Sequence, residues 1–187
     1  MAKKLFVLSG SSGVGKGTVI NGFLKRNPSF SLSISCTTRN ARKGEVDGVN
    51  YFFLSREEFD KSIENGEFLE WAEFAQNRYG TKRAFVEKCL REGKDLILEI
   101  ETVGALKVKE QMPEAVLIFI APPSFEELEF RLRNRHTEDE ATIQKRLSAV
   151  REELERAQKY DYQIINDNLE TAILTLEEII KKEEQNG

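Results

Sequence analysis

Cysteine and histidine are scarce in this sequence, with two Cys and one His in 187 residues. Cys36 and Cys89 lie far apart and have no Cys or His neighbours at the spacing that metal ligands require. These residues predict neither a disulfide framework nor a zinc site. The length and an apolar fraction of 40% suit one folded domain, which excludes a disordered or fibrous chain.

Long hydrophobic runs are also missing. The first apolar stretch, Leu5 to Ser9, is too short for a secretory signal or a membrane span. There is no positive excess, because 28 Lys and Arg stand against 32 Asp and Glu, a net charge of −4. Proteins that bind nucleic acid or anionic membranes usually have the opposite balance. We therefore expect a cytoplasmic protein that binds neither.

The charge is unevenly distributed along the chain. Residues 1–44 contain eight Lys or Arg and no acidic residue, whereas the remainder is acidic overall. A short positive segment within an acidic protein favours small anionic ligands over a long polyanion.

Five apolar segments have the length of strands: 5–8, 31–35, 96–100, 115–120 and 162–165. They do not alternate between apolar and polar side chains, which indicates burial on both faces. Segments with helical periodicity separate them, and 139–160 and 169–180 are amphipathic. The pattern predicts an α/β fold in which helices cover both faces of a parallel sheet.

Residues 37–80 interrupt this rhythm. They contain two turn-like clusters, RKGEVDGVN and QNRYG, two aromatic strands, YFFL and FLEWAEF, and one helix from about Ser55. Ser55 with Glu58, and later Ser124 with Glu127, have the spacing of capping boxes. The stretch indicates a small inserted lobe rather than a crossover between strands.

A glycine-rich loop, GSSGVGKGT, follows the first strand and precedes a helix. Such a loop directs backbone N–H groups and the positive end of the helix at one anion, and Lys16 adds charge near the β- and γ-phosphates. Contacts to nucleotide phosphates are predicted for Gly10, Ser11, Ser12, Gly13, Val14, Gly15, Lys16, Gly17 and Thr18. Gly17 stands where Ser or Thr normally holds Mg²⁺, so we expect Mg²⁺ to be bound through water or by Thr18.

The rest of the sequence limits which class of nucleotide-binding protein this loop can belong to. No Asn-Lys-x-Asp is present, so the base-reading motif of GTPases is missing. A small phosphate-loop domain with an inserted lobe and a later arginine cluster suits phosphoryl transfer between two nucleotides.

A second site is predicted from the inserted lobe. Arg39 and Arg42, with hydroxyl residues before them and Tyr51 after, form a forked donor set for a phosphate monoester. Glu70 places a carboxylate in an otherwise apolar strand. A guanine edge offers two adjacent N–H donors that one carboxylate accepts, whereas adenine offers an acceptor there. We therefore assign Glu70 to a guanine base.

Together these motifs resemble guanylate kinase over about residues 4–180. The matching segments are the phosphate loop, TTRxxRxGExxGxxYxF at 37–53, FLEW at 68–71, YGT at 79–81, ILEIE at 97–101, the arginine stretch 131–137 and IIND at 164–167. The resemblance implies one domain with the P-loop NTPase fold and a five-stranded parallel sheet. Its parts would be a core (about 1–36, 82–124 and 147–187), a GMP-binding lobe (about 37–81) and a lid (about 125–146). It also implies transfer of the γ-phosphoryl group of ATP to GMP, with Mg²⁺ as cofactor.

The resemblance further implies roles for individual residues. Guanine contacts would come from Ser35, Glu70, Thr81 and Glu101, and the GMP phosphate clamp from Arg39, Arg42, Tyr51 and Tyr79. Glu45, Gly80 and Glu99 belong to the same GMP-binding motifs. Glu99 either orders Mg²⁺ waters or makes a structural hydrogen bond. Arg131, Arg135 and Arg146 would reach the ATP phosphates from the lid, and Asn166 would lie near the adenine. Lys16, Arg42, Arg135 and Arg146 would neutralise the transferring group.

Two positions differ from the family pattern. Glu101 stands where many members have Asp, and His136 where Gly is common. Two alternatives to this activity are a kinase for another nucleoside monophosphate and a non-catalytic guanylate-kinase-like binding module. The complete phosphate loop favours an enzyme over a binding module. The sequence carries no signal for an oligomeric state.

Overall fold

The five apolar segments form one parallel sheet in a computed structural model of the chain, which describes residues 4–11, 13–74, 76–133 and 140–185. Across this sheet the order is β2 (Phe30–Leu32), β7 (Asp95–Glu99), β1 (Leu5–Gly10), β8 (Val116–Ala121) and β9 (Tyr162–Ile165). Every neighbouring pair is parallel. The predicted α/β fold with a five-stranded parallel sheet is confirmed.

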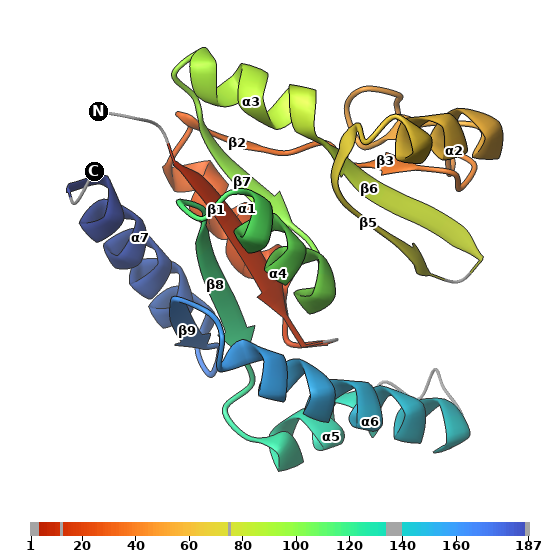
Figure 1. Cartoon of the computed structure of the whole chain (residues 1–187). Coiled ribbons are helices and arrows are strands. Elements are labelled where there is room, and N and C mark those ends of the chain that lie inside the picture. Colours follow the sequence, from red (N-terminus) through yellow and green to blue (C-terminus); the bar gives the residue numbers. More distant parts are fainter. Residues whose placement is uncertain (1–3, 12, 75, 134–139, 186–187) are drawn as a thin grey trace.

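Helices cover both faces of this sheet (Figure 1). Along β1, Leu5 and Val7 join one buried cluster, whereas Phe6 and Leu8 join another. The first cluster includes side chains of α3 (Arg83–Arg91) and α4 (Thr102–Gln111). The second includes side chains of α1 (Lys16–Arg26) and α7 (Leu169–Gln185). Burial on both sides explains why the strands are almost continuous apolar runs.

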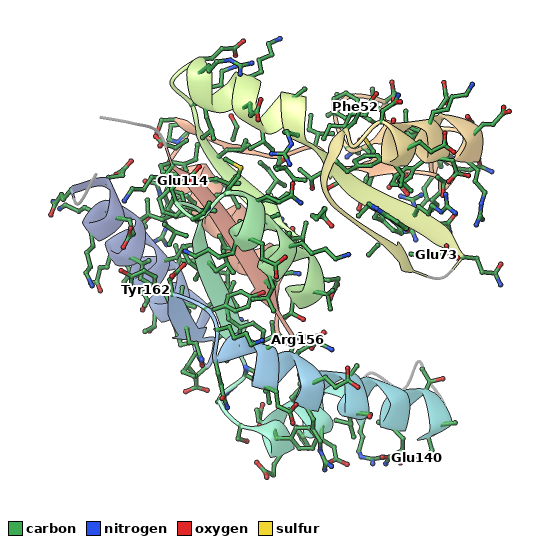
Figure 2. All side chains as sticks on the ribbon, in the orientation of Figure 1. Phe52, Glu73, Glu114, Glu140, Arg156 and Tyr162 are labelled. Atoms are coloured by element: carbon green, nitrogen blue, oxygen red, sulfur yellow. The ribbon has the colours of Figure 1, made fainter. Side chains whose placement is uncertain are left out.

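A second sheet lies to one side of the core. Its order is β4 (Phe52–Phe53), β3 (Cys36–Thr37), β6 (Asn77–Lys82) and β5 (Phe68–Phe74), and α2 (Arg56–Glu64) packs on it. Phe59 and Phe68 stack there with ring centroids 4.4 Å apart. Phe52 lies where this lobe meets the core (Figure 2), with its ring centroid 5.8 Å from that of Phe85 in α3.

Two sequence predictions about this region need correction. Asn77 to Gly80, part of the expected turn QNRYG, lie in strand β6, and only Gln76 has a left-handed φ, at 65°. Gly80 permits close strand approach, because a Cβ there would lie 3.0 Å from the Glu70 carbonyl oxygen. The expected strand 31–35 is shorter, since β2 ends at Leu32 and the chain then crosses into the lobe.

Helix boundaries follow the predicted signals. Ser55 Oγ accepts the Glu58 N–H while the Glu58 carboxylate accepts the Ser55 N–H, so the first capping box is complete. Ser124 Oγ accepts the Glu127 N–H at the start of α5 (Phe125–Arg133). The helix expected over 139–160 is α6 (Glu140–Ala157), which packs on α5 around Leu128, Ile143, Leu147 and Val150. None of the helices in the described part of the chain is long and apolar enough to cross a membrane.

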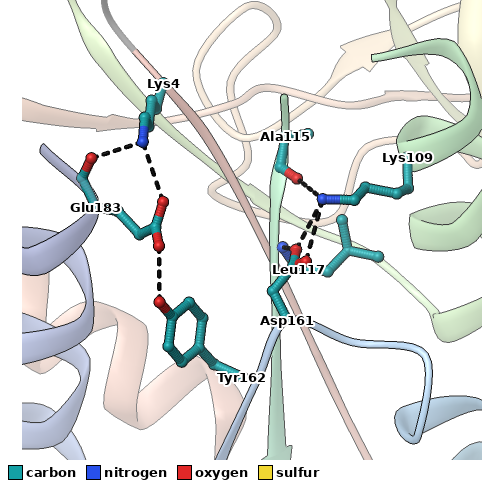
Figure 3. Close-up of polar contacts among 7 residues, drawn as sticks. All are labelled: Lys4, Lys109, Ala115, Leu117, Asp161, Tyr162 and Glu183. Carbon is teal, nitrogen blue, oxygen red and sulfur yellow. Dashed lines mark hydrogen bonds and ion pairs between the residues drawn. The ribbon is translucent and has the colours of Figure 1, made fainter. Parts of the chain in front are cut away.

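Polar contacts join elements at the amino-terminal ends of the strands (Figure 3). Lys4 donates to the Glu183 carbonyl at 2.6 Å, and the Tyr162 hydroxyl donates to the Glu183 carboxylate at 2.7 Å. Lys109 of α4 donates to Asp161 at 2.9 Å. Open α/β sheets bind ligands at the carboxyl ends of their strands. These groups lie at the opposite edge of the sheet.

Candidate functional site

The phosphate loop leaves the sheet where β1 ends and enters α1 at Lys16. Gly13 and Gly15 have φ values of 85° and 88°, which only glycine adopts readily. A Cβ at Gly10 would lie 2.6 Å from the Ile120 carbonyl oxygen, so this glycine lets the loop start against β8. The first turn of α1 holds no acidic residue, which leaves the positive end of the helix uncompensated for an anion.

The side chain of Asn166 supports this loop. It is buried after β9, and its Nδ2 donates to the Val14 carbonyl oxygen at 2.7 Å. The Asn166 backbone N–H donates to the Ala121 carbonyl at 2.8 Å, which fixes the residue to β8. A residue predicted to lie near adenine therefore contacts the main chain of the phosphate loop.

Lys16 and Glu99 bring the loop and β7 together. Lys16 Nζ lies 3.8 Å from Glu99 Oε1, and Glu99 is the last residue of β7. The Glu99 carboxylate suits Mg²⁺, which is usually held by one or two carboxylates together with phosphates and water. Thr18 adds an exposed hydroxyl, and the Cβ position of Gly17 is 3.9 Å from Glu99 Oε1. No three His, Cys, Asp or Glu side chains gather as a closed metal cage among residues 4–11, 13–74, 76–133 and 140–185.

A cluster of Arg39, Glu45 and two tyrosines forms part of the lobe. Arg39 Nη2 donates to Glu45 Oε1 at 2.9 Å, and its guanidinium carbon lies 5.4 Å from the Tyr51 ring centroid. Tyr51 in turn packs edge-on against Tyr79, with centroids 6.2 Å apart. The Arg39 guanidinium and the Arg42 backbone N–H both lower the pKa of the Glu45 carboxyl. The guanidinium thus already faces an anionic group, and the Arg42 side chain is exposed.

Glu70 is the buried acid of the lobe. Its residue is 6% exposed, and its Oε1 accepts the Thr81 hydroxyl at 2.7 Å across the β5–β6 pair. Burial raises the pKa of the Glu70 carboxyl, while the bond from Thr81 acts in the opposite direction. A buried carboxylate with one oxygen still uncommitted to Thr81 suits a ligand that carries N–H donors.

One cavity of about 430 Å³ connects these features. Its walls include eight residues that the sequence singled out: Lys16, Ser35, Tyr51, Glu70, Tyr79, Gly80, Glu99 and Glu101. Thr81 adjoins it through Glu70, and Arg39 with Glu45 adjoins it through Tyr51. Glu101 is the N-cap residue of α4, and its side chain makes no capping bond to that helix. The cavity therefore extends from the phosphate loop to the buried acid.

Several predicted residues lie outside the described part of the structure. These are Ser12 and Arg135, together with His136, and the side chains of Arg131 and Arg146. Their contacts stay predictions from the sequence.

The sequence alone did not identify seven further residues that line the cavity: Leu32, Ser33, Asn50, Ala72, Ile100, Val103 and Gly104. Ser33 is 8% exposed, and its Oγ has no hydrogen-bond partner among the described residues. The sequence signal that could have identified Ser33 as a cavity residue is its place among the hydroxyl residues before Arg39. Leu32 and Ile100 end or follow parallel strands, which is the position that the fold reserves for ligand contacts.

Known proteins match the chain over almost its whole length. A model of the guanylate kinase family matches residues 2–183. A guanylate kinase of Clostridioides difficile is 51% identical over 96% of this chain and 87% of that protein. One from Prochlorococcus marinus is 52% identical over 95% of this chain and 94% of that protein.

Solved structures agree with these sequence matches. The crystal structure of guanylate kinase from Anaplasma phagocytophilum is 36% identical, with a TM-score of 0.77 over 97% of this chain and 86% of that one. Shikimate kinase from Bacteroides thetaiotaomicron is 15% identical with a TM-score of 0.50, covering 95% of this chain and 98% of that chain, and shares only the fold.

Proposed function

Since this chain belongs to the guanylate kinase family, we propose that it transfers the γ-phosphoryl group of ATP to GMP, giving ADP and GDP. The enzyme is an ATP:GMP phosphotransferase. One observation carries the assignment: the buried Glu70 carboxylate and the Lys16 ammonium line the same cavity. A base held at one end thereby places its phosphate toward the other end, where the phosphate loop holds ATP.

The phosphate loop receives the ATP phosphates. The main chain of the loop and the positive end of α1 receive the anion, and Lys16 neutralises charge on the β- and γ-phosphates. Asn166 acts from beneath the loop, because its amide holds the Val14 carbonyl. Glu99 and Thr18 would hold Mg²⁺, directly or through water, and the bound ion supplies charge neutralisation across the phosphate oxygens.

GMP occupies the lobe side of the cavity. Glu70 accepts the two adjacent N–H donors of guanine, and Thr81 fixes the carboxylate in place. The GMP phosphate binds near Tyr51 and Tyr79, with Arg39 exchanging its Glu45 partner for the phosphate. Ser35, Gly80 and Glu101 complete the wall around the nucleotide.

The reaction requires positioning rather than covalent catalysis. An oxygen of the GMP phosphate forms a bond to the γ-phosphorus while the bond from that phosphorus to ADP breaks. The attacking oxygen is already ionised at neutral pH, so no general base is needed. Lys16 and the arginines of the lobe and the lid neutralise the charge on the transferring group.

The segments divide this work by region. The core holds ATP and residues 37–81 hold GMP, while residues 125–146, which include α5, form a lid that closes over ATP. Closure excludes water and so suppresses hydrolysis of ATP in the absence of GMP. From the sequence, we predict that Arg131, Arg135 and Arg146 reach the phosphates in that closed state.

The test is a coupled assay with Mg-ATP and each of GMP, AMP, CMP and UMP. We expect product from GMP and little from the others. Glu70→Gln should lower kcat/KM for GMP at least about tenfold, because one acceptor oxygen becomes an N–H donor that faces the donors of guanine. Glu73→Gln is the control, since Glu73 is exposed at the far tip of the same strand (Figure 2).

Three outcomes would contradict the proposal. If no GDP forms from Mg-ATP and GMP, the protein is a non-catalytic binding module instead of a kinase. Preference for another nucleoside monophosphate would identify a kinase for a different base. Equal activity of Glu70→Gln and Glu73→Gln would remove Glu70 from base recognition.

A further inference from the structure

Gly104 lies against the Glu70 carboxylate. It is the third residue of α4, and the position of its absent Cβ is 2.8 Å from Glu70 Oε2 and 3.3 Å from the Glu70 carboxyl carbon. Ordinary contacts of a Cβ begin at about 3.4 Å. The carboxylate therefore occupies the space that any other residue at position 104 would fill.

The helix itself does not need glycine at this position. Gly104 has none of the left-handed φ values that favour glycine, and the next residue, Ala105, is fully buried with a side chain. Glycine inside a helix is less stable than alanine at the same position. Gly104 thus lowers the stability of the helix, and neither the backbone conformation nor the helix requires a glycine there. The neighbouring Glu70 carboxylate explains why the position has no side chain.

The strand that carries Glu70 cannot retreat from α4. Gln111 Nε2 of α4 donates to the Leu69 carbonyl at 2.7 Å, and Leu69 packs with Ala105 and Val108 in one buried cluster. On the other side, Thr81 holds Glu70 Oε1 at 2.7 Å. A methyl group at position 104 would therefore move the carboxylate rather than the backbone, and the free direction leads into the cavity.

We propose that Gly104 is a positioning residue for base selection: by lacking a side chain, it lets the Glu70 carboxylate lie deep enough to accept both N–H donors of guanine. This inference rests on the proposed transfer to GMP. The displacement forced by a methyl group is roughly half an ångström, because an ordinary contact of 3.4 Å would replace the present 2.8 Å, and a shift of that size weakens hydrogen bonds from the base to the carboxylate. The effect should appear in recognition of the base and not in the transfer step.

The experiment is Gly104→Ala measured with GMP, AMP and ATP as variable substrates. We expect KM for GMP to rise about tenfold, kcat at saturating GMP and KM for ATP to change less than about twofold, and discrimination against AMP to fall. The melting temperature should stay level or rise, because alanine is the better helix former. A merely structural role would lower the melting temperature without a selective change in KM for GMP. Glu110→Ala, an exposed position of the same helix, is the control and should leave each quantity unchanged.

Combined variants show whether Gly104 acts through Glu70. In a Glu70→Gln background, Gly104→Ala should add little, because the acceptor pair is already lost. Should the single variant fold poorly, Glu70→Asp with Gly104→Ala should melt higher than Gly104→Ala alone, since the shorter acid leaves room for the methyl group. A KM for GMP within twofold of the parent or full additivity in the Glu70→Gln background would overturn the inference. For a poorly folded Gly104→Ala variant, no recovery of melting temperature on adding Glu70→Asp would also overturn it. A parent enzyme without activity on GMP would instead reject the proposed function before any variant is compared.

Discussion

Asn166→Ala tests how the phosphate loop is held. The Asn166 amide bonds the buried Val14 carbonyl at 2.7 Å, and its Nδ2 lies 3.0 Å from the position that a Cβ at Gly15 would take. Removing one partner leaves a buried carbonyl unsatisfied, which costs about 1–3 kcal/mol. At about 2 kcal/mol, and roughly 2–4 °C per kcal/mol for a protein of this size, the melting temperature should fall by about 4–8 °C.

Activity should respond in the same variant. A loop whose main chain is no longer fixed binds phosphate less well, so KM for ATP should rise severalfold while KM for GMP stays within about twofold. The assays are thermal unfolding monitored by circular dichroism and initial rates at varied ATP. Asn65→Ala is a matched control, because the Asn65 amide makes only an exposed 3.3 Å contact with Glu67.

Two results would refute this reasoning. A higher KM for ATP with an unchanged melting temperature would assign Asn166 to direct nucleotide contact instead of loop support. An unchanged KM for ATP with a lower melting temperature would show that the bond from Asn166 to Val14 stabilises the fold but does not affect ATP binding.

Three further predictions follow from single side chains. Burial raises the pKa of Glu70 above its unfolded value, so KM for GMP should rise as the pH falls through that raised pKa. The stabilising contribution of Glu70 is present below its unfolded pKa and is lost as the pH rises through its folded pKa. The melting temperature of Glu70→Gln should therefore exceed that of the parent most near pH 8 and least near pH 4. Gly17→Ser has room, with Glu99 Oε1 3.9 Å from the Cβ position, and should lower the Mg²⁺ concentration at half-maximal rate at least about threefold in a Mg²⁺ titration; an unchanged requirement would contradict a metal beside Glu99. Ser55→Ala removes one half of the capping box with Glu58 and should lower stability by about 1 kcal/mol in urea unfolding while kcat/KM is unchanged; equal stability would show that the cap contributes nothing.

Much of the fold could be predicted from sequence because its signals are local. Leu5 to Leu8 and the segment 115–120 are apolar on both faces, which only a covered parallel sheet explains. Ser55 and Glu58 likewise define a helix start within four residues. Strand β6 was missed because Gly80 looks like a turn residue, whereas its role is close packing against β5.

The candidate site was only partly predictable for a related reason. Lys16 and Glu70 carry recognisable chemistry in short motifs, and both line the cavity. Ser33 and Gly104 do not, because their importance comes from which groups the fold places beside them. From sequence, a glycine in a helical segment predicts only a less stable helix. The distance from its Cβ position to Glu70 Oε2 is what indicates that Gly104 makes room for the carboxylate.

The order of the strands has a consequence for how the protein is made. Among the strands of this sheet, β1 is synthesised first but lies in the middle, and Leu5 meets its partner Leu96 only after the roughly 90 residues between them have been made. Phe23 of α1 waits longer, because its cluster is completed by Ile173 and Leu176 of α7. The earliest apolar surfaces are therefore the last to be covered, so newly made chains should depend on chaperones or fast completion until α7 docks.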